Sequence, residues 1–126
     1  MPTYHNTAIQ TAEMQAVITE AGSGALGYLY NGTQPANGDP VTGGNTLIAE
    51  VTFGATLGTA SGGVLTFGAI TGDASANASG APTFIEIRKS DGTTLVARYV
   101  TAGFPTCTAG QSVDITGMTV SSGNVG

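Results

Sequence analysis

The sequence predicts a mainly β protein, an antiparallel β-sandwich or a jelly-roll-like barrel, with one short N-terminal α-helix. After Gly24, short runs of alternating apolar and polar residues are separated by Gly, Asn, Asp and Pro, which is typical of about six or seven strands joined by turns. Before Gly24, one stretch has helical spacing. The 126 residues fit a single domain over 1–126, which we divide into an N-terminal arm (1–6), a helix (7–22) and a sandwich (24–121).

The predicted helix has a start signal, a stop signal and one apolar face. Thr7 and Gln10 have the spacing of a capping box, in which Thr7 is the N-cap. Gly22 is the residue type that commonly ends a helix in left-handed backbone. The larger apolar residues lie three or four positions apart and share one face: Met14, Val17, Ile18 and Ala21. We expect this face to dock on the β-structure.

Alternation of apolar and polar residues predicts the strands that precede the hairpin described below. The first spans 25–30. In 47–53, the odd-numbered residues form the buried face and Glu50 faces water. A third strand spans 64–70, with one apolar face made of Leu65, Phe67 and Ala69.

Two long loops and a final strand complete the expected sandwich. The loop 31–40 is rich in turn residues, and the loop 71–82 is nearly all small and polar, a composition that allows mobility unless a partner holds it. The last strand lies near 113–120. Its apolar residues change parity at Gly117, so we expect a bulge there.

A β-hairpin is predicted over 84–100. Apolar residues alternate on both sides of Asp91 and Gly92, a pair typical of tight turns, and Gly92 adopts left-handed backbone at little cost. The hairpin also contains every basic residue of the chain: Arg88, Lys89 and Arg98.

The loop length of this hairpin decides which residues pair. A two-residue loop pairs Ile87 with Val96 and places Ile85 on the same face as Arg98, whereas a three-residue loop pairs Ile87 with Leu95 and keeps one face apolar. We therefore expect the three-residue loop, with Ile85 opposite Ala97. The outward, wetter face then carries Glu86, Arg88, Thr94, Val96 and Arg98, with the carboxylate of Glu86 within reach of either arginine.

The composition excludes some partners. Charged residues make up 9% of the chain, against about a quarter in most soluble domains. The formal net charge of −5, with three basic residues, argues against nucleic-acid binding. No segment has the apolar length of a membrane span or the pattern of a secretory signal, so we expect no membrane contact. A surface with so few charges is suited to being covered in a homo-oligomer or by another protein.

Residues with catalytic or metal-binding chemistry are sparse and scattered. Gly22, Gly24 and Gly27 match the letters of a dinucleotide-binding loop, but a helix precedes them and a strand follows, the reverse of the required order. Cys107 is the only cysteine and is expected to be a small buried or half-buried side chain. His5 is the only histidine. We therefore predict no catalytic residue, no metal site, no cofactor and no enzymatic activity, although paired-carboxylate chemistry through glutamates and aspartates stays open.

Candidate interface residues fall into three groups. Tyr28 and Tyr30 share one face of the first strand and are expected either to pack in the protein or to stack on a sugar or a partner protein. The hairpin cations Arg88, Lys89 and Arg98 are expected either to lie on a solvated face or to meet an acidic partner. The N-terminal arm, with Tyr4 and His5, is expected to become ordered against a partner.

Several segments resemble, in the same order along the chain, small β-rich virion structural proteins of tailed bacteriophages: 30–36 (YNGTQPA), 47–53 (LIAEVTF), 63–80 (GVLTFGAITGDASANASG) and 90–94 (SDGTT). The resemblance covers most of the chain but consists of turns and strands, without a chemical signature. It implies a capsid decoration or cement protein that bridges subunits of the major capsid protein, as a homo-oligomer, in a virion assembled in the host cytoplasm. The alternatives are a tail or neck component and a glycan-binding adhesion module.

Overall fold

The computed structural model describes residues 6–35, 40–41, 43–100, 106–115 and 119–121. Within these residues the chain forms one helix and eight strands, in the order α1 (Thr7–Ala21), β1 (Leu26–Tyr30), β2 (Leu47–Phe53), β3 (Gly58–Ser61), β4 (Val64–Phe67), β5 (Ile70–Thr71), β6 (Phe84–Arg88), β7 (Leu95–Val100) and β8 (Thr119–Ser121). The predicted mainly β fold with one N-terminal helix is confirmed. Residues 1–5 of the predicted arm and the predicted bulge at Gly117 lie outside the described residues.

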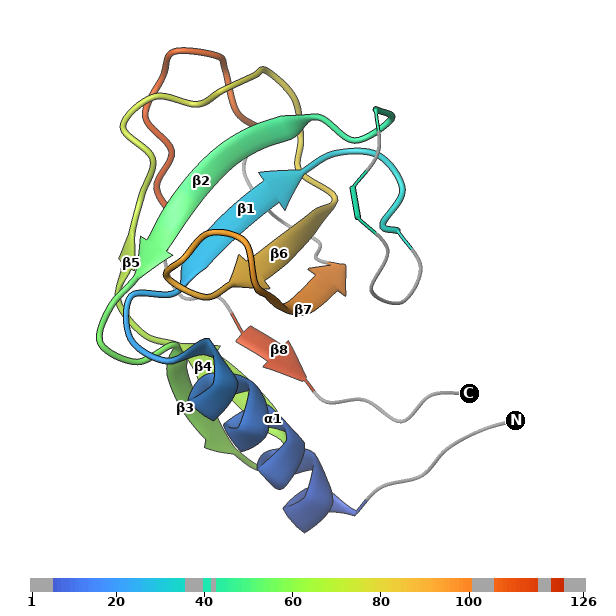
Figure 1. Cartoon of the computed structure of the whole chain (residues 1–126), viewed down its shortest axis with the longest axis vertical. Helices are drawn as coiled ribbons and strands as arrows, with labels where there is room; N and C mark the ends of the chain where they lie inside the picture. The colour runs from blue at the N-terminus through green and yellow to red at the C-terminus, as the bar shows by residue number, and fades with distance from the viewer. Residues whose placement is uncertain (1–5, 36–39, 42, 101–105, 116–118, 122–126) are drawn as a thin grey trace.

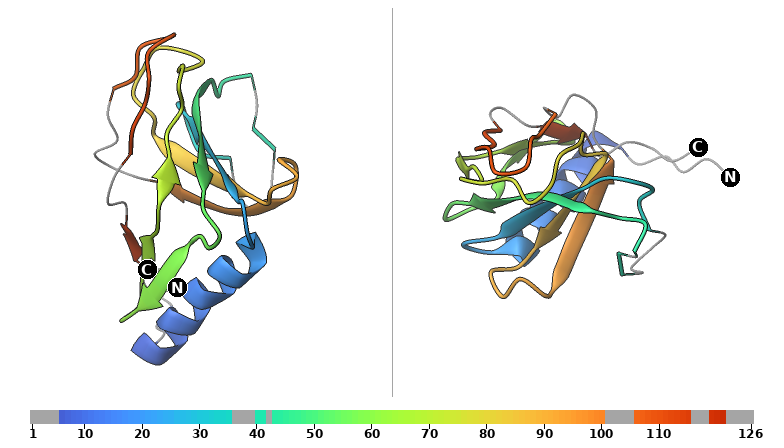
Figure 2. Two further views of the ribbon diagram at one scale, coloured as in Figure 1. Left: turned by 90° about the vertical axis from the view of Figure 1, so that its left-hand side faces the viewer. Right: turned by 90° about the horizontal axis from the view of Figure 1, so that it is seen from above.

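Two antiparallel sheets make up the β-structure (Figure 1). The larger sheet has the order β5-β2-β1-β6-β7, and the smaller sheet has the order β3-β4-β8. The larger sheet is open and does not close into a barrel, so the jelly-roll-like barrel is not the architecture formed. Figures 1 and 2 place α1 beside β3 and β4 at one end of the molecule, where the helix also contacts β7.

The core lies between the inward face of the larger sheet and a second layer, built from β4 and two segments, 72–80 and 106–115. The rings of Phe53 and Phe67 join the two layers and stack with centroids 5.3 Å apart. Cys107 is buried, as predicted. Burial, followed by the charge of Asp73, raises the pKa of its thiol, so the sulfur stays protonated and weakly nucleophilic.

The segments 72–80 and 106–115 lie side by side and hold each other (Figure 2). The N–H of Asp73 donates to the carbonyl of Val113 at 2.9 Å, and the N–H of Gly80 donates to the carbonyl of Cys107 at 3.0 Å. The predicted loop 71–82 therefore needs no partner protein to fix its backbone, because the chain's own 106–115 segment supplies the hydrogen bonds.

The helix begins one residue earlier than its capping signal indicates. Asn6, not Thr7, is the N-cap, and its Oδ1 accepts a hydrogen bond from the N–H of Ile9 at 2.9 Å. Asparagine caps at least as well as threonine, so the capping-box spacing alone does not identify the cap. The stop signal at Gly22, with φ of 69°, is confirmed. The predicted apolar face is confirmed too, with these residues buried: Met14, Ile18 and Ala21.

The strands β2, β4 and β5 depart from strict alternation in two places. The predicted strand 64–70 is interrupted, because the N–H of Gly68 bonds to the carbonyl of Leu57, and Ala69 is exposed. Ile48, expected on the outward face, is fully buried. The pairing of β1 with β2 shifts by one residue there, so the alternation no longer sets its side. The sequence pattern does not predict β3, because this strand is short and its side chains are too small to alternate clearly.

The predicted register of the β6–β7 hairpin is wrong by two residues. Ile87 pairs with Ala97, not Leu95, and Ile85 pairs with Tyr99. A shift of two keeps each side chain on its own face, so the apolar face of β6 is predicted correctly. The exceptions lie at the register shift between Ile87 and Arg88: Leu95 lies opposite Arg88 on the other face, and Val96, expected on the outward face, packs against the core.

The longer hairpin loop is explained by Asp91. Its Oδ1 accepts hydrogen bonds from the N–H groups of Thr93 and Thr94, and its Oδ2 accepts one from the Thr94 hydroxyl at 2.6 Å. The loop then closes where the N–H of Lys89 donates to the carbonyl of Thr94 at 3.0 Å. Gly92 has a φ of 75°, as predicted.

Candidate functional site

The outward face of the larger sheet brings together a row of tyrosines and charged residues from β1, β6 and β7. Glu86 of β6 lies opposite Tyr28 of β1 on one side and opposite Arg98 of β7 on the other. Opposing residues of antiparallel strands point to the same side of a sheet, so these three side chains are neighbours. Arg88 and Tyr30 lie on the same face, two residues further along β6 and β1 respectively.

The centre of this row is a buried carboxylate held by two guanidinium groups. The side chain of Glu86 is 2% exposed. Its Oε1 accepts hydrogen bonds from Nη2 of Arg88 at 2.7 Å and from Nε of Arg88 at 2.9 Å. Its Oε2 accepts one from Nε of Arg98, also at 2.7 Å. We call Glu86, Arg88 and Arg98 the charge cluster. Such charge-assisted, partly bidentate bonds compensate the cost of burying the carboxylate.

Arg88 also anchors the two tyrosines and the hairpin loop. Its Nη2 donates to the Tyr30 hydroxyl at 3.1 Å and its Nη1 to the carbonyl of Gly92 at 3.0 Å, and its Cζ lies 4.1 Å from the centroid of the Tyr28 ring. Burial alone lowers the pKa of Arg88, but the hydrogen bonds and charge of Glu86 outweigh burial and raise it. Tyr30 in turn stacks on Phe84 with centroids 5.5 Å apart. Burial raises the pKa of its hydroxyl, so Tyr30 is a neutral hydrogen-bond partner of Arg88.

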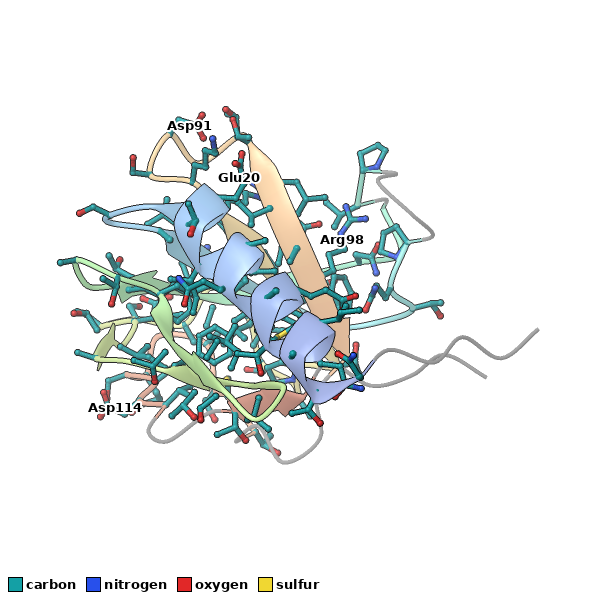
Figure 3. All side chains as sticks on the ribbon, turned by 90° about the horizontal axis from the view of Figure 1, so that it is seen from below. Glu20, Asp91, Arg98 and Asp114 are labelled. Atoms are coloured by element: carbon teal, nitrogen blue, oxygen red, sulfur yellow. The ribbon has the colours of Figure 1, made fainter. Side chains whose placement is uncertain are left out.

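A pocket of about 340 Å³ lies above the charge cluster. Its walls come from two connections that are far apart in the sequence, the β6–β7 loop and the connection between β1 and β2. In Figure 3, Arg98 lies between the β7 ribbon and the latter connection. The charge cluster forms one side of the pocket, and the remaining lining residues are Pro40, Val41, Gly92, Thr93 and Leu95.

The expected outward, wetter face of the hairpin is not a solvated face. Glu86 is buried, and the side chain of Arg98 is 4% exposed. Pro40 and Val41, from the connection between β1 and β2, lie over these side chains as part of the lining of the same pocket. Sequence reasoning on the hairpin alone misses this cover, since it comes from a loop more than forty residues away in the sequence.

The other candidate interface residues are divided between the surface and the interior. The side chain of Lys89 is 38% exposed, and its Nζ lies 2.8 Å from Oε1 of Glu20 on α1. Tyr28 is half-buried and Tyr30 is buried, so packing is the main role of the pair. Tyr4 and His5 lie outside the described residues. All three basic residues of the chain are thus paired with a carboxylate.

The aspartates that are bound to the backbone have structural roles. The Oδ2 of Asp73 accepts from the N–H of Glu50, and its Oδ1 accepts from the N–H of Ser75. Figure 3 shows Asp91 beside Glu20 at one end of the view and Asp114 at the other.

Among the described residues, no group of three or more histidine, cysteine or acidic side chains is placed to hold a metal ion. The described helix is too short and too polar to span a membrane.

Comparison of the chain with protein-family models, with curated proteins and with solved structures found no match.

Proposed function

We propose that this protein is a non-enzymatic structural protein of a tailed-phage virion, a decoration subunit that binds the major capsid protein on the outside of the shell. The observation that carries the proposal is the internal use of charge. Each basic side chain is engaged by a carboxylate, two of them inside the charge cluster. The remaining surface is dominated by uncharged Gly, Ala, Ser and Thr. Burying an unpaired charge is costly, so a surface with few free charges loses little when another protein covers it.

The rigidity of the loop segments supports the same role. The segments 72–80 and 106–115 are held to each other by backbone hydrogen bonds, so little conformational entropy is lost when they meet a partner. A shell presents the same partner surface many times in symmetric array. An oligomeric decoration subunit gains avidity from such repetition, even where each contact is weak. The resemblance of the sequence to small phage virion proteins agrees with this use of the fold.

The tyrosines give less support to a glycan-binding module. Stacking on a sugar requires an open ring face. The guanidinium of Arg88 covers one face of Tyr28, and Tyr30 is buried against Phe84. Their side chains are therefore committed to the protein's own packing.

The proposal is tested by adding the purified protein to capsids that lack it. We expect binding that saturates at a stoichiometry fixed by the symmetry of the shell, measured by sedimentation and by electron microscopy. Purified tails of the same phage are the matched control. Saturable binding to tails with none to capsids would replace the decoration role with that of a tail or neck component.

A further inference from the structure

We propose that the pocket above the charge cluster binds a carboxylate of a partner protein, either an acidic side chain or a chain terminus, through the guanidinium of Arg88. The identity of that partner as the capsid protein rests on the function proposed above. The chemistry of the pocket is tested independently of it.

The hydrogen-bonding groups on the charged side of the pocket leave one donor for a ligand. Both oxygens of Glu86 already accept hydrogen bonds from arginine, so the negative charge of this carboxylate is balanced before a ligand binds. Arginine has five N–H donors. Within the described residues Arg88 uses four of them: Nε–H and one from Nη2 to Glu86, the other from Nη2 to Tyr30, and one from Nη1 to Gly92. One N–H of Nη1 is left for a ligand.

Arg88 is the most accessible member of the charge cluster. The side chain of Arg88 is 20% exposed, whereas those of Glu86 and Arg98 are 2% and 4% exposed. A ligand in the pocket therefore meets the positive guanidinium of Arg88 before it meets the buried carboxylate. The lining contains two arginines and one glutamate, so the formal charge of these three residues is positive.

Another part of the pocket is lined by apolar side chains. Pro40, Val41 and Leu95 form part of the pocket wall. The volume of about 340 Å³ lies at the lower end of ligand pockets, enough for one side chain or one terminal residue. Arginine is one of the residue types enriched at interface hot spots, and here it lies beside an apolar wall. The pocket therefore fits a carboxylate that carries a short apolar stem.

The probe for this pocket is sodium valerate, with valeramide as its uncharged isostere. We expect valerate, added to the ¹⁵N-labelled full chain, to cause saturable chemical-shift changes at the amides of Gly92, Thr93 and Leu95. Valeramide should bind at least about tenfold more weakly, because it lacks the charge that Arg88 recognises. Equal binding of the two probes, or no saturable change with valerate at these amides, would overturn the proposal.

Three variants separate the pocket from the fold. Arg88→Gln should abolish the preference for valerate, but it also removes a partner of buried Glu86 and can unfold the protein. Val41→Glu keeps the charge cluster and places a competing carboxylate in the lining, so it should weaken valerate binding about tenfold or more. Lys89→Gln removes an exposed cation outside the pocket and should leave binding unchanged. Unchanged binding in Val41→Glu, or loss of binding in Lys89→Gln, would show that valerate binds elsewhere.

The two proposals fail separately. If the protein binds valerate in this pocket but does not bind capsids, the pocket proposal stands and the decoration role is wrong. If the protein saturates capsids but does not bind valerate, the decoration role stands and the pocket proposal is wrong. The contact with the shell then lies elsewhere on the surface of the protein.

Discussion

Arg98 of β7 lies directly opposite Glu86 of β6, and its Nε donates a hydrogen bond to Oε2 of that buried carboxylate at 2.7 Å. The pair links the edge strand of the larger sheet to its neighbour through side chains as well as through the backbone ladder. The pair also neutralises one of the chain's few cations. The hairpin is therefore not a basic patch.

Loss of the Glu86 charge should destabilise the protein strongly. Glu86→Gln leaves the guanidinium groups of Arg88 and Arg98 without their shared carboxylate, and we expect the free energy of unfolding to fall by about 3 kcal/mol. Urea denaturation followed by circular dichroism measures this change. The matched control is Glu50→Gln on the exposed face of β2, which should change the stability by less than about 0.5 kcal/mol.

The coupling of Glu86 to Arg98 should be measurable in a double-mutant cycle. We expect the two single variants, Glu86→Gln and Arg98→Gln, to be non-additive by about 1–3 kcal/mol, because the residues share one buried contact. A parallel cycle on Glu20 and Lys89, an exposed pair at a similar distance, should show much weaker coupling. Equal coupling in both cycles would contradict the buried character of the Glu86 pair.

Gly27 should not tolerate a side chain. A Cβ at this position would lie 2.8 Å from Cγ2 of Val51 and 3.1 Å from Cδ1 of Ile85, closer than packed carbon atoms allow. We therefore expect Gly27→Ala to lower the free energy of unfolding by about 1–3 kcal/mol, through overpacking of the core beneath β1. Gly43→Ala is the control, since a Cβ there meets no atom within 4 Å, and its thermal unfolding should match that of the parent protein.

The hairpin loop should weaken in acid. The hydrogen bond from the Thr94 hydroxyl, followed by those from the N–H groups of Thr94 and Thr93, holds the pKa of Asp91 well below its usual range. A lowered folded-state pKa stabilises the fold above the unfolded value of about 3.9, and the contribution is lost as the pH falls toward the folded value. Asp91→Ala should therefore reduce the loss of thermal stability between about pH 4 and pH 2.

The aspartate that serves as a control for this acid effect is Asp114. It is exposed and accepts no hydrogen bond from any described residue. Asp114→Ala should retain the full acid destabilisation of the parent protein. If Asp91→Ala and Asp114→Ala lost stability in acid to the same degree as the parent, the hydrogen bonds to Asp91 would not be the source of the effect.

The sequence predicts most of the fold because its local signals agree with the packing. The single helix, its stop at Gly22 and the apolar inward face of β6 follow from spacing alone. The hairpin register does not, because the Asp91 side chain stabilises a loop longer than either of those that the spacing allows. The burial of Ile48 depends on a shift in strand pairing that leaves no local signal.

The candidate site is predictable only in part. The sequence places Glu86, Arg88 and Arg98 on one face of a hairpin, which is where the structure has them. It does not predict the pocket, because Pro40 and Val41, which line it together with these side chains, come from a distant connection. Such a long-range contact depends on the tertiary structure. No periodicity or motif in the segment around Pro40 and Val41 predicts it.

The number of copies of this protein in purified virions tests the proposed function most directly. Quantitative mass spectrometry against the major capsid protein gives this ratio, whichever surface of the protein makes the contact. A decoration subunit should be present at a fixed ratio to the capsid protein, on the order of hundreds of copies for a symmetric shell. Only a few copies per particle, or none, would contradict the decoration role.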